Sequence, residues 1–200
     1  MHASLRIATP ADGPAIRSIY APYVESTAIT FETEVPTTEE MTDQIEQTHE
    51  AFPWIVCETE NEGVVGYATA SSLRSKAAYA WAVELTVYVD DDIQQSGVGT
   101  ALYTSLLETL REQGYVDAYA AVTLPNSASV SLHENFAFEP VGTFPAAGHK
   151  QGSWHDVQWW HRQLGEHPAD PEPPTPMETM KDSSALETAL RSGEAALADE

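Results

Sequence analysis

The chain has 200 residues, of which 42% are hydrophobic, so it is long enough for one domain with a full core, or for one domain and a tail. It carries 31 acidic residues against nine Lys and Arg, for a formal net charge of −22. Such a surface repels phosphate backbones, which excludes nucleic acid as an expected partner. The single cysteine, Cys57, excludes an internal disulfide and a cysteine-based zinc site.

The acidity extends over the whole chain. Residues 165–200 hold nine acidic and two basic residues, which leaves a net charge of −15 on residues 1–164. At molar salt the Debye length falls to about 3 Å, and self-repulsion of this kind is screened. We therefore interpret the composition as halophilic, with an ordinary acidic protein as the alternative. We see no secretory signal and no apolar run long enough for a membrane span, so we expect a cytoplasmic protein.

The first half of the chain predicts alternating helices and strands. A short strand at 4–7 precedes a helix that begins at Thr9-Pro10, where Thr is the N-cap and Pro the first helical residue. Thr37 or Thr38 begins an acidic helix that ends near Thr48. Two strands at 54–58 and 64–70 form a hairpin.

The second half contains the most informative segments. A strand at 83–89 alternates apolar and polar residues, and a helix follows from about Gly97 to Gln113. Further elements are predicted as a strand at 118–122, a short helix to about Asn135, and strands at 138–142 and 154–162. Residues 165–200 begin with a proline-rich stretch, so we expect mostly disorder there. A docked or dimer-contact helix at 178–198 is the alternative.

A glycine-bearing loop joins the strand at 83–89 to the next helix, with the pattern Gln94-x-x-Gly97-x-Gly99. Backbone N–H groups at such a helix start point together and can bind a pyrophosphate. The dinucleotide-binding pattern would need a third glycine at Leu102, and the lysine of a Walker loop is absent.

Several short motifs in the same order resemble the phosphinothricin N-acetyltransferase family, within the acetyl-CoA-dependent N-acetyltransferase (GNAT) superfamily. The resemblance covers almost all of residues 1–164. Besides the glycine loop, it rests on FETE at 31–34, PWIV at 53–56, AYAW at 78–81, ELTVYV at 84–89, TLPN at 123–126, SVSLHE at 129–134, AGHK at 147–150 and WHDV at 154–157.

This resemblance implies a mixed, strongly twisted α/β (α+β) sheet of six to seven strands flanked by helices. The sheet should have a gap between the strands at 83–89 and 118–122. It also implies acetyl-CoA as co-substrate, no metal and a homodimer. The expected coenzyme contacts are backbone groups of the strand, the pyrophosphate loop and a residue near the thioester: Val87, Tyr88, Val89, Gln95, Ser96, Gly97, Val98, Gly99, Thr100 and Asn126.

Two residues match catalytic positions of the family. Glu84 resembles its general base, because a neutral amine must be generated before it attacks a thioester. His133 lies where related enzymes place an acid that protonates the departing thiolate, and it is a candidate acid or base. The alternative for Glu84 is that it has no catalytic role and is one of the 31 acidic residues of the chain. The alternative for His133 is a structural helix histidine whose ring is hydrogen-bonded to a carbonyl.

The acceptor site is predicted from the loop before the strand at 83–89. Arg74, Lys76 and Tyr79 are candidates to bind the acceptor's carboxylate or phosphinate, and Phe31 is a candidate pocket wall. The spacing of His149, His155, Asp156 and His161 matches no zinc pattern.

Together these features predict a GNAT domain over residues 1–164 that transfers acetyl from acetyl-CoA to the amino group of a small amino acid. Acceptors of the phosphinothricin, methionine sulfoximine or methionine sulfone type are expected. A protein or peptide N-acetyltransferase and a catalytically silent CoA-binding regulator are the alternatives.

Overall fold

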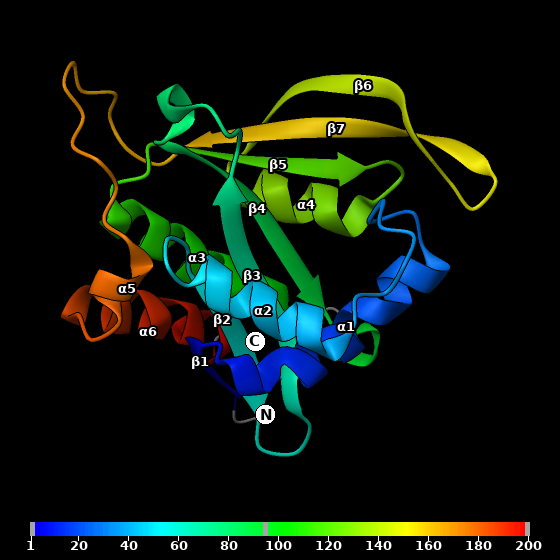
Figure 1. Ribbon diagram of the computed structural model, residues 1–200, viewed down its shortest axis with the longest axis horizontal. Coiled ribbons are helices and arrows are strands. Elements are labelled where there is room, and N and C mark those ends of the chain that lie inside the picture. The colour runs from blue at the N-terminus through cyan, green and yellow to red at the C-terminus, as the bar shows by residue number, and fades with distance from the viewer. Residues whose placement is uncertain (1–2, 94–95, 199–200) are drawn as a thin grey trace.

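A seven-stranded mixed sheet organises the protein (Figure 1), whose computed structural model describes residues 3–93 and 96–198. The strands are β1 (Ala3–Ile7), β2 (Trp54–Thr59), β3 (Gly63–Ser72), β4 (Ala82–Val89), β5 (Asp117–Thr123), β6 (Glu139–Lys150) and β7 (Ser153–Gln163). Their spatial order is β1-β2-β3-β4-β5-β7-β6, and β4–β5 is the parallel pair. This confirms the predicted fold class.

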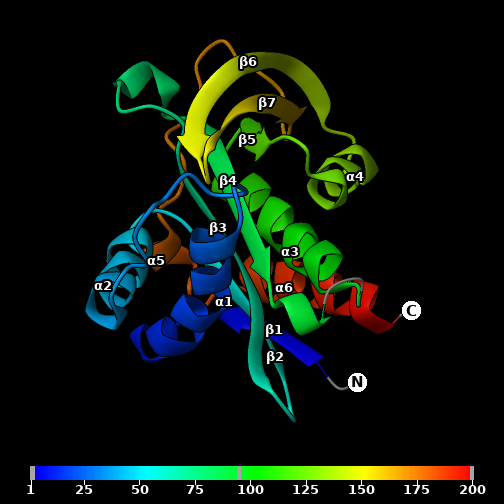
Figure 2. The same ribbon diagram turned by 90° about the vertical axis from the view of Figure 1, so that its right-hand side faces the viewer.

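Helices cover both faces of the sheet (Figure 2). They are α1 (Gly13–Ser26), α2 (Thr38–Thr48), α3 (Val98–Gln113), α4 (Ser127–Asn135), α5 (Met177–Met180) and α6 (Ser184–Ala198), with short 3-10 turns η1 (Pro10–Asp12), η2 (Ala77–Tyr79) and η3 (Asp91–Ile93). The alternation along β4 explains the two layers. Val83 and Leu85 are buried with α3, whereas Tyr88 packs into the core that α1 and α2 cover.

The parallel pair separates soon after it begins. Cross-strand partners join β4 and β5 at Ala82–Asp117, Val83–Ala118 and Glu84–Tyr119, whereas β4 continues to Val89 along β3. The gap predicted between these two strands is therefore present, and Glu84 lies at the point where they part.

Local sequence signals explain the helix ends. The Thr37 side chain caps α2 by accepting a hydrogen bond from the Glu40 N–H, and the Glu40 carboxylate accepts one from the Thr37 N–H. Gly114 ends α3 at φ 92°, in the left-handed region that favours glycine.

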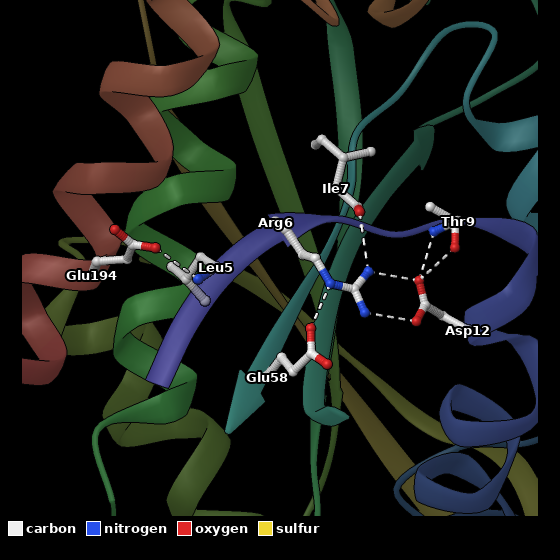
Figure 3. A network of polar contacts seen from close by, with 7 residues as sticks. All are labelled: Leu5, Arg6, Ile7, Thr9, Asp12, Glu58 and Glu194. Atoms are coloured by element: carbon white, nitrogen blue, oxygen red, sulfur yellow. Dashed lines mark hydrogen bonds and ion pairs between the residues drawn. The ribbon is translucent and has the colours of Figure 1, made fainter. Parts of the chain in front are cut away.

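Arg6 joins β1, β2 and the start of α1 (Figure 3). Its guanidinium donates two hydrogen bonds to Asp12, at 2.7 and 2.8 Å, and one to Glu58 at 2.7 Å. The hydrogen bond from Arg6 is the largest cause that lowers the pKa of Asp12. Asp12 also accepts from the Thr9 N–H, so one carboxylate anchors the turn that begins the helix.

The C-terminal segment differs from our expectation of disorder. Met177 and Met180 are buried, and α6 packs along α3 and β1. The Ser105 hydroxyl in α3 donates to the Ala189 carbonyl, and Glu194 accepts the Leu5 N–H of the edge strand (Figure 3). A weak apolar stripe thus becomes a stable helix because α3 offers a complementary surface, as the docked-helix alternative supposed.

The closing hairpin is longer than predicted. β6 runs to Lys150 and β7 returns from Ser153, with Gln151 and Gly152 at φ 50° and 76° in the turn. Two consecutive positive φ values are typical of a tight hairpin turn whose twist matches its strands. Among the described helices, none has the length and apolar character to cross a membrane.

Candidate active site

Glu84 occupies the fork between β4 and β5. Its cross-strand partners are Ser71 on β3 and Tyr119 on β5. Directly opposed side chains share one face of a sheet, so the carboxylate lies between a hydroxymethyl and a phenol on the α1/α2 face. Burial raises the pKa of Glu84 and the positive charge of Arg74 opposes that rise. A partly desolvated carboxylate with a raised pKa is suited to accept a proton near neutral pH.

Of the residues that are predicted to bind the acceptor amino acid, Arg74 interacts electrostatically with Glu84. Its guanidinium carbon lies 5.5 Å from the centre of the Trp159 ring, and it donates to the Leu73 carbonyl at 2.6 Å. Lys76 and Tyr79 are also exposed, at the beginning and end of η2. The loop before β4 therefore presents two cations and a phenol.

Phe31 lies in the loop between α1 and α2 and is 37% exposed. Its ring packs so closely on Gly148 of β6 that a Cβ there would clash with it. The neighbouring Thr30 carbonyl accepts a hydrogen bond of 2.8 Å from the buried Lys150 ammonium. These contacts attach the loop to the β6–β7 hairpin, an attachment that the sequence motifs did not indicate.

The predicted pyrophosphate loop leads into α3. Gly97 has φ 76° and is the N-cap, and the Ser96 hydroxyl donates to the Ile93 carbonyl at 2.6 Å. Val98 is buried, so only its backbone can serve a ligand. A Cβ on Gly99 would come no closer than 3.9 Å to Val89, which leaves space above the helix start. Thr100 is exposed, and Gln95 lies outside the described residues.

The stretch of β4 that is predicted to bind the coenzyme is Val87, Tyr88 and Val89, beyond the fork. The Tyr88 side chain belongs to an aromatic cluster, with ring centres 5.0 Å from Tyr20 and 4.9 Å from Tyr23. It therefore turns away from the open edge, and only backbone groups remain for a ligand. The Tyr23 hydroxyl donates to the Val89 carbonyl at 2.5 Å, a contact that sequence reasoning missed.

His133 is buried in the core on α4. Its Nδ1 donates to the Ser129 carbonyl at 2.6 Å, so Nε2 is the acceptor for the Tyr103 hydroxyl at 2.8 Å. Burial lowers the pKa of His133. Both ring nitrogens therefore have hydrogen-bond partners inside the protein. This geometry fits the alternative of a structural helix histidine, rather than an acid or base that contacts substrate. Asn126 caps the same helix by accepting the Ser129 N–H, which leaves its amide NH₂ to donate.

Other titratable groups lie outside this site. Cys57 is buried, which raises the pKa of its thiol to about 11 and makes it a poor nucleophile. Within residues 3–93 and 96–198, no group of three or more His, Cys, Asp or Glu side chains is placed to hold a metal ion.

Comparison with known proteins agrees with this geometry. Residues 5–159 match the family described as "Acetyltransferase (GNAT) domain". The chain is 42% identical over 173 residues to a phosphinothricin N-acetyltransferase of Streptomyces viridochromogenes, covering 86% of this chain and 93% of that one. A methionine sulfoximine/methionine sulfone acetyltransferase of Pseudomonas aeruginosa is 34% identical, over 82% of this chain and 96% of the relative.

A solved structure gives the same result. A phosphinothricin acetyltransferase of Sinorhizobium meliloti in complex with acetyl-CoA superposes with a TM-score of 0.81 at 32% identity, over 86% of this chain and 94% of that one. The fold and site thus define a GNAT acetyltransferase that uses acetyl-CoA as co-substrate. Within that superfamily the chain belongs to the phosphinothricin N-acetyltransferase family, as the motifs predicted.

Proposed function

We propose that the protein transfers acetyl from acetyl-CoA to the amino group of a small amino acid or analogue. Acceptors of the phosphinothricin, methionine sulfoximine and methionine sulfone type are the candidates suggested by the relatives' names. The observation that carries the proposal is the partly buried Glu84 at the fork of β4 and β5, beside the open edge of β4.

Glu84 is the proposed general base. An amino acid arrives mostly as an ammonium ion, and the carboxylate takes one proton, directly or through water. The neutral nitrogen then attacks the thioester carbonyl carbon and loses its second proton to solvent, and the C–S bond breaks as the amide forms. The CoA thiolate leaves with the bonding electron pair and is protonated from solvent. His133 is assigned a positioning role, because its hydrogen bonds join α4 to Tyr103 of α3.

The two substrates approach the fork from opposite ends. Amides around Gly97 and Gly99 bind the pyrophosphate, and the pantetheine arm follows the edge of β4 as an added strand would. Arg74 binds the acceptor carboxylate, since a guanidinium pairs with a carboxylate through two hydrogen bonds.

A free-thiol assay at high KCl, with a panel of amino acids, tests this assignment. Thiol release that depends on an amino acid supports it. Release only with peptides or protein N-termini would favour a protein acetyltransferase instead. Acetyl-CoA binding without release for any amine would indicate a silent regulator.

We also propose that the enzyme is a homodimer from a salt-rich cytoplasm. β6 forms a long edge strand beside β7, and it is exposed along nearly its whole length. The hairpin also displays Val141, Phe144 and Trp154 at 63%, 55% and 67% exposure. A long, apolar edge strand is typical of a surface that a second chain covers. Light scattering of the wild type and of Phe144→Glu tests this, with a monomeric variant as the expected result.

A further inference from the structure

A hollow of about 270 Å³ lies at the beginning of β4 and β5, where the two strands are still paired, on the side of the fork opposite to Val87–Val89. Ala82 and Asp117 are cross-strand partners in its wall, and they precede the pair Glu84 and Tyr119 by two residues on each strand. Side chains alternate along strands, so all four lie on one face, about 6.7 Å apart along the strand. Tyr119 also lines the hollow, which therefore begins beside the proposed base.

The C-terminal segment supplies one wall of this hollow. Residues 165–176, which we call the strap, descend from β7 to α5 (orange in Figure 1). His167 hydrogen-bonds Asp117 at 2.8 Å, and the Trp81 indole N–H donates to the Glu172 carbonyl at 2.8 Å. Pro168 and Pro171, which line the hollow, lie between these two attachments. Two hydrogen bonds thus fix this wall, one on each side of the prolines, and the strap residues that form them lie outside the predicted GNAT domain.

The lining favours an uncharged ligand group. Tyr79, Trp81 and Tyr119 present aromatic surface, and the strap adds its two prolines. Both oxygens of the Asp117 carboxylate in the wall already have hydrogen-bond partners, because one accepts from His161 and the other from His167, each at 2.8 Å. Aromatic and proline surface binds apolar side chains by excluding water from them.

We propose that this hollow binds the side chain of the acceptor amino acid, and that the strap selects acceptors whose side chains are apolar or aromatic and carry no charge. The inference rests on the proposed function and specifies its acceptor. The amine lies at Glu84 and the carboxylate at Arg74. A side chain of methionine or phenylalanine length spans the separation of about 6.7 Å between the Glu84 and Ala82 positions. An anionic phosphinate would have to lose its hydration against this wall, so among the candidate acceptors the subsite favours the uncharged sulfoximine and sulfone over phosphinothricin.

Two matched variants test the inference in the full chain. Ala78→Phe fills the hollow from η2, and Ala80→Phe places the same ring at the exposed C-cap of η2, outside the lining. We measure kcat/KM for L-alanine, L-norleucine, L-phenylalanine and phosphinothricin, and KM for acetyl-CoA. We expect Ala78→Phe to lower kcat/KM for norleucine and phenylalanine about tenfold or more, with alanine and acetyl-CoA values unchanged. Ala80→Phe should match the wild type throughout.

His167→Ala provides a second test at a side chain that is 60% exposed, so folding is little affected. Releasing the strap should raise KM for phenylalanine and leave KM for alanine unchanged. Equal losses for all acceptors in Ala78→Phe, or a wild-type preference for phosphinothricin over norleucine, would overturn the subsite and leave the proposed function intact. Failure of the wild type to acetylate any amino acid would remove both.

Discussion

Gly193 decides whether α6 packs on α3 as described. A Cβ at this position would clash with the Ser105 hydroxyl and the Ala101 carbonyl of α3, and would lie 2.6 Å from Leu5 Cδ1. A backbone carbonyl inside a helix cannot move aside, so Gly193→Ala must push the two helices apart. That shift also weakens the 3.0 Å hydrogen bond from Ser105 to the Ala189 carbonyl.

Two opposing effects set the size of the change. Alanine is favoured over glycine in a helix by about 0.8–1.0 kcal/mol. Overpacking costs about 1–3 kcal/mol, and the weakened hydrogen bond about 1 kcal/mol. Destabilisation therefore wins, by about 1–3 kcal/mol, which corresponds to a fall in Tm of about 2–12 °C for a chain of this size.

Thermal unfolding in concentrated KCl measures this difference. Ser192→Ala is the matched control, because the neighbouring side chain is exposed on the same helix, and its Tm should change little. A Tm for Gly193→Ala equal to or above the wild-type value would refute the docking of α6 and restore the expectation of a disordered tail.

Four further predictions concern catalysis, charge and pH. Glu84→Gln should lower turnover by about 10²–10⁴ while calorimetry shows unchanged acetyl-CoA binding, and it should abolish the fall in rate that the wild type shows as pH drops through the raised pKa of Glu84. Melting curves at about 0.1 M and about 3 M KCl should show a large gain in Tm with salt, and equal values would contradict a halophilic surface. Asp12→Asn should lower the free energy of unfolding in denaturant titrations by about 1–2 kcal/mol, a modest loss because Arg6 is partly exposed. Because the pKa of Asp12 is lowered in the folded state, the stabilisation that Asp12 provides is present above its unfolded pKa and is lost as pH falls through the folded value. His133→Gln should flatten the loss of wild-type stability below about pH 6.5, because the lowered pKa of His133 lets the unfolded chain bind the proton first, and a steeper loss would contradict its buried position.

The sequence by itself determined the features whose causes lie within a few residues. Helix ends follow from Thr37 and Gly114, because a cap and a left-handed turn are local conformations. Alternation along 83–89 assigned Glu84 to the face opposite Val83 and Leu85, and the motif order identified the family. These inferences hold because the period of a strand and the chemistry of a motif do not depend on which distant segment packs nearby.

Tertiary structure alone decided the features that depend on surfaces distant in the chain. His133 found its second partner 30 residues away, and that contact favours a positioning role over proton exchange. The apolar stripe of 184–198 was too weak to predict a stable helix, and it became one because Gly193 allows close approach to α3. The hollow beyond Glu84 exists because the strap crosses the beginning of β5. Burial depends on both of the surfaces that pack together, so it cannot be predicted from the sequence of one segment.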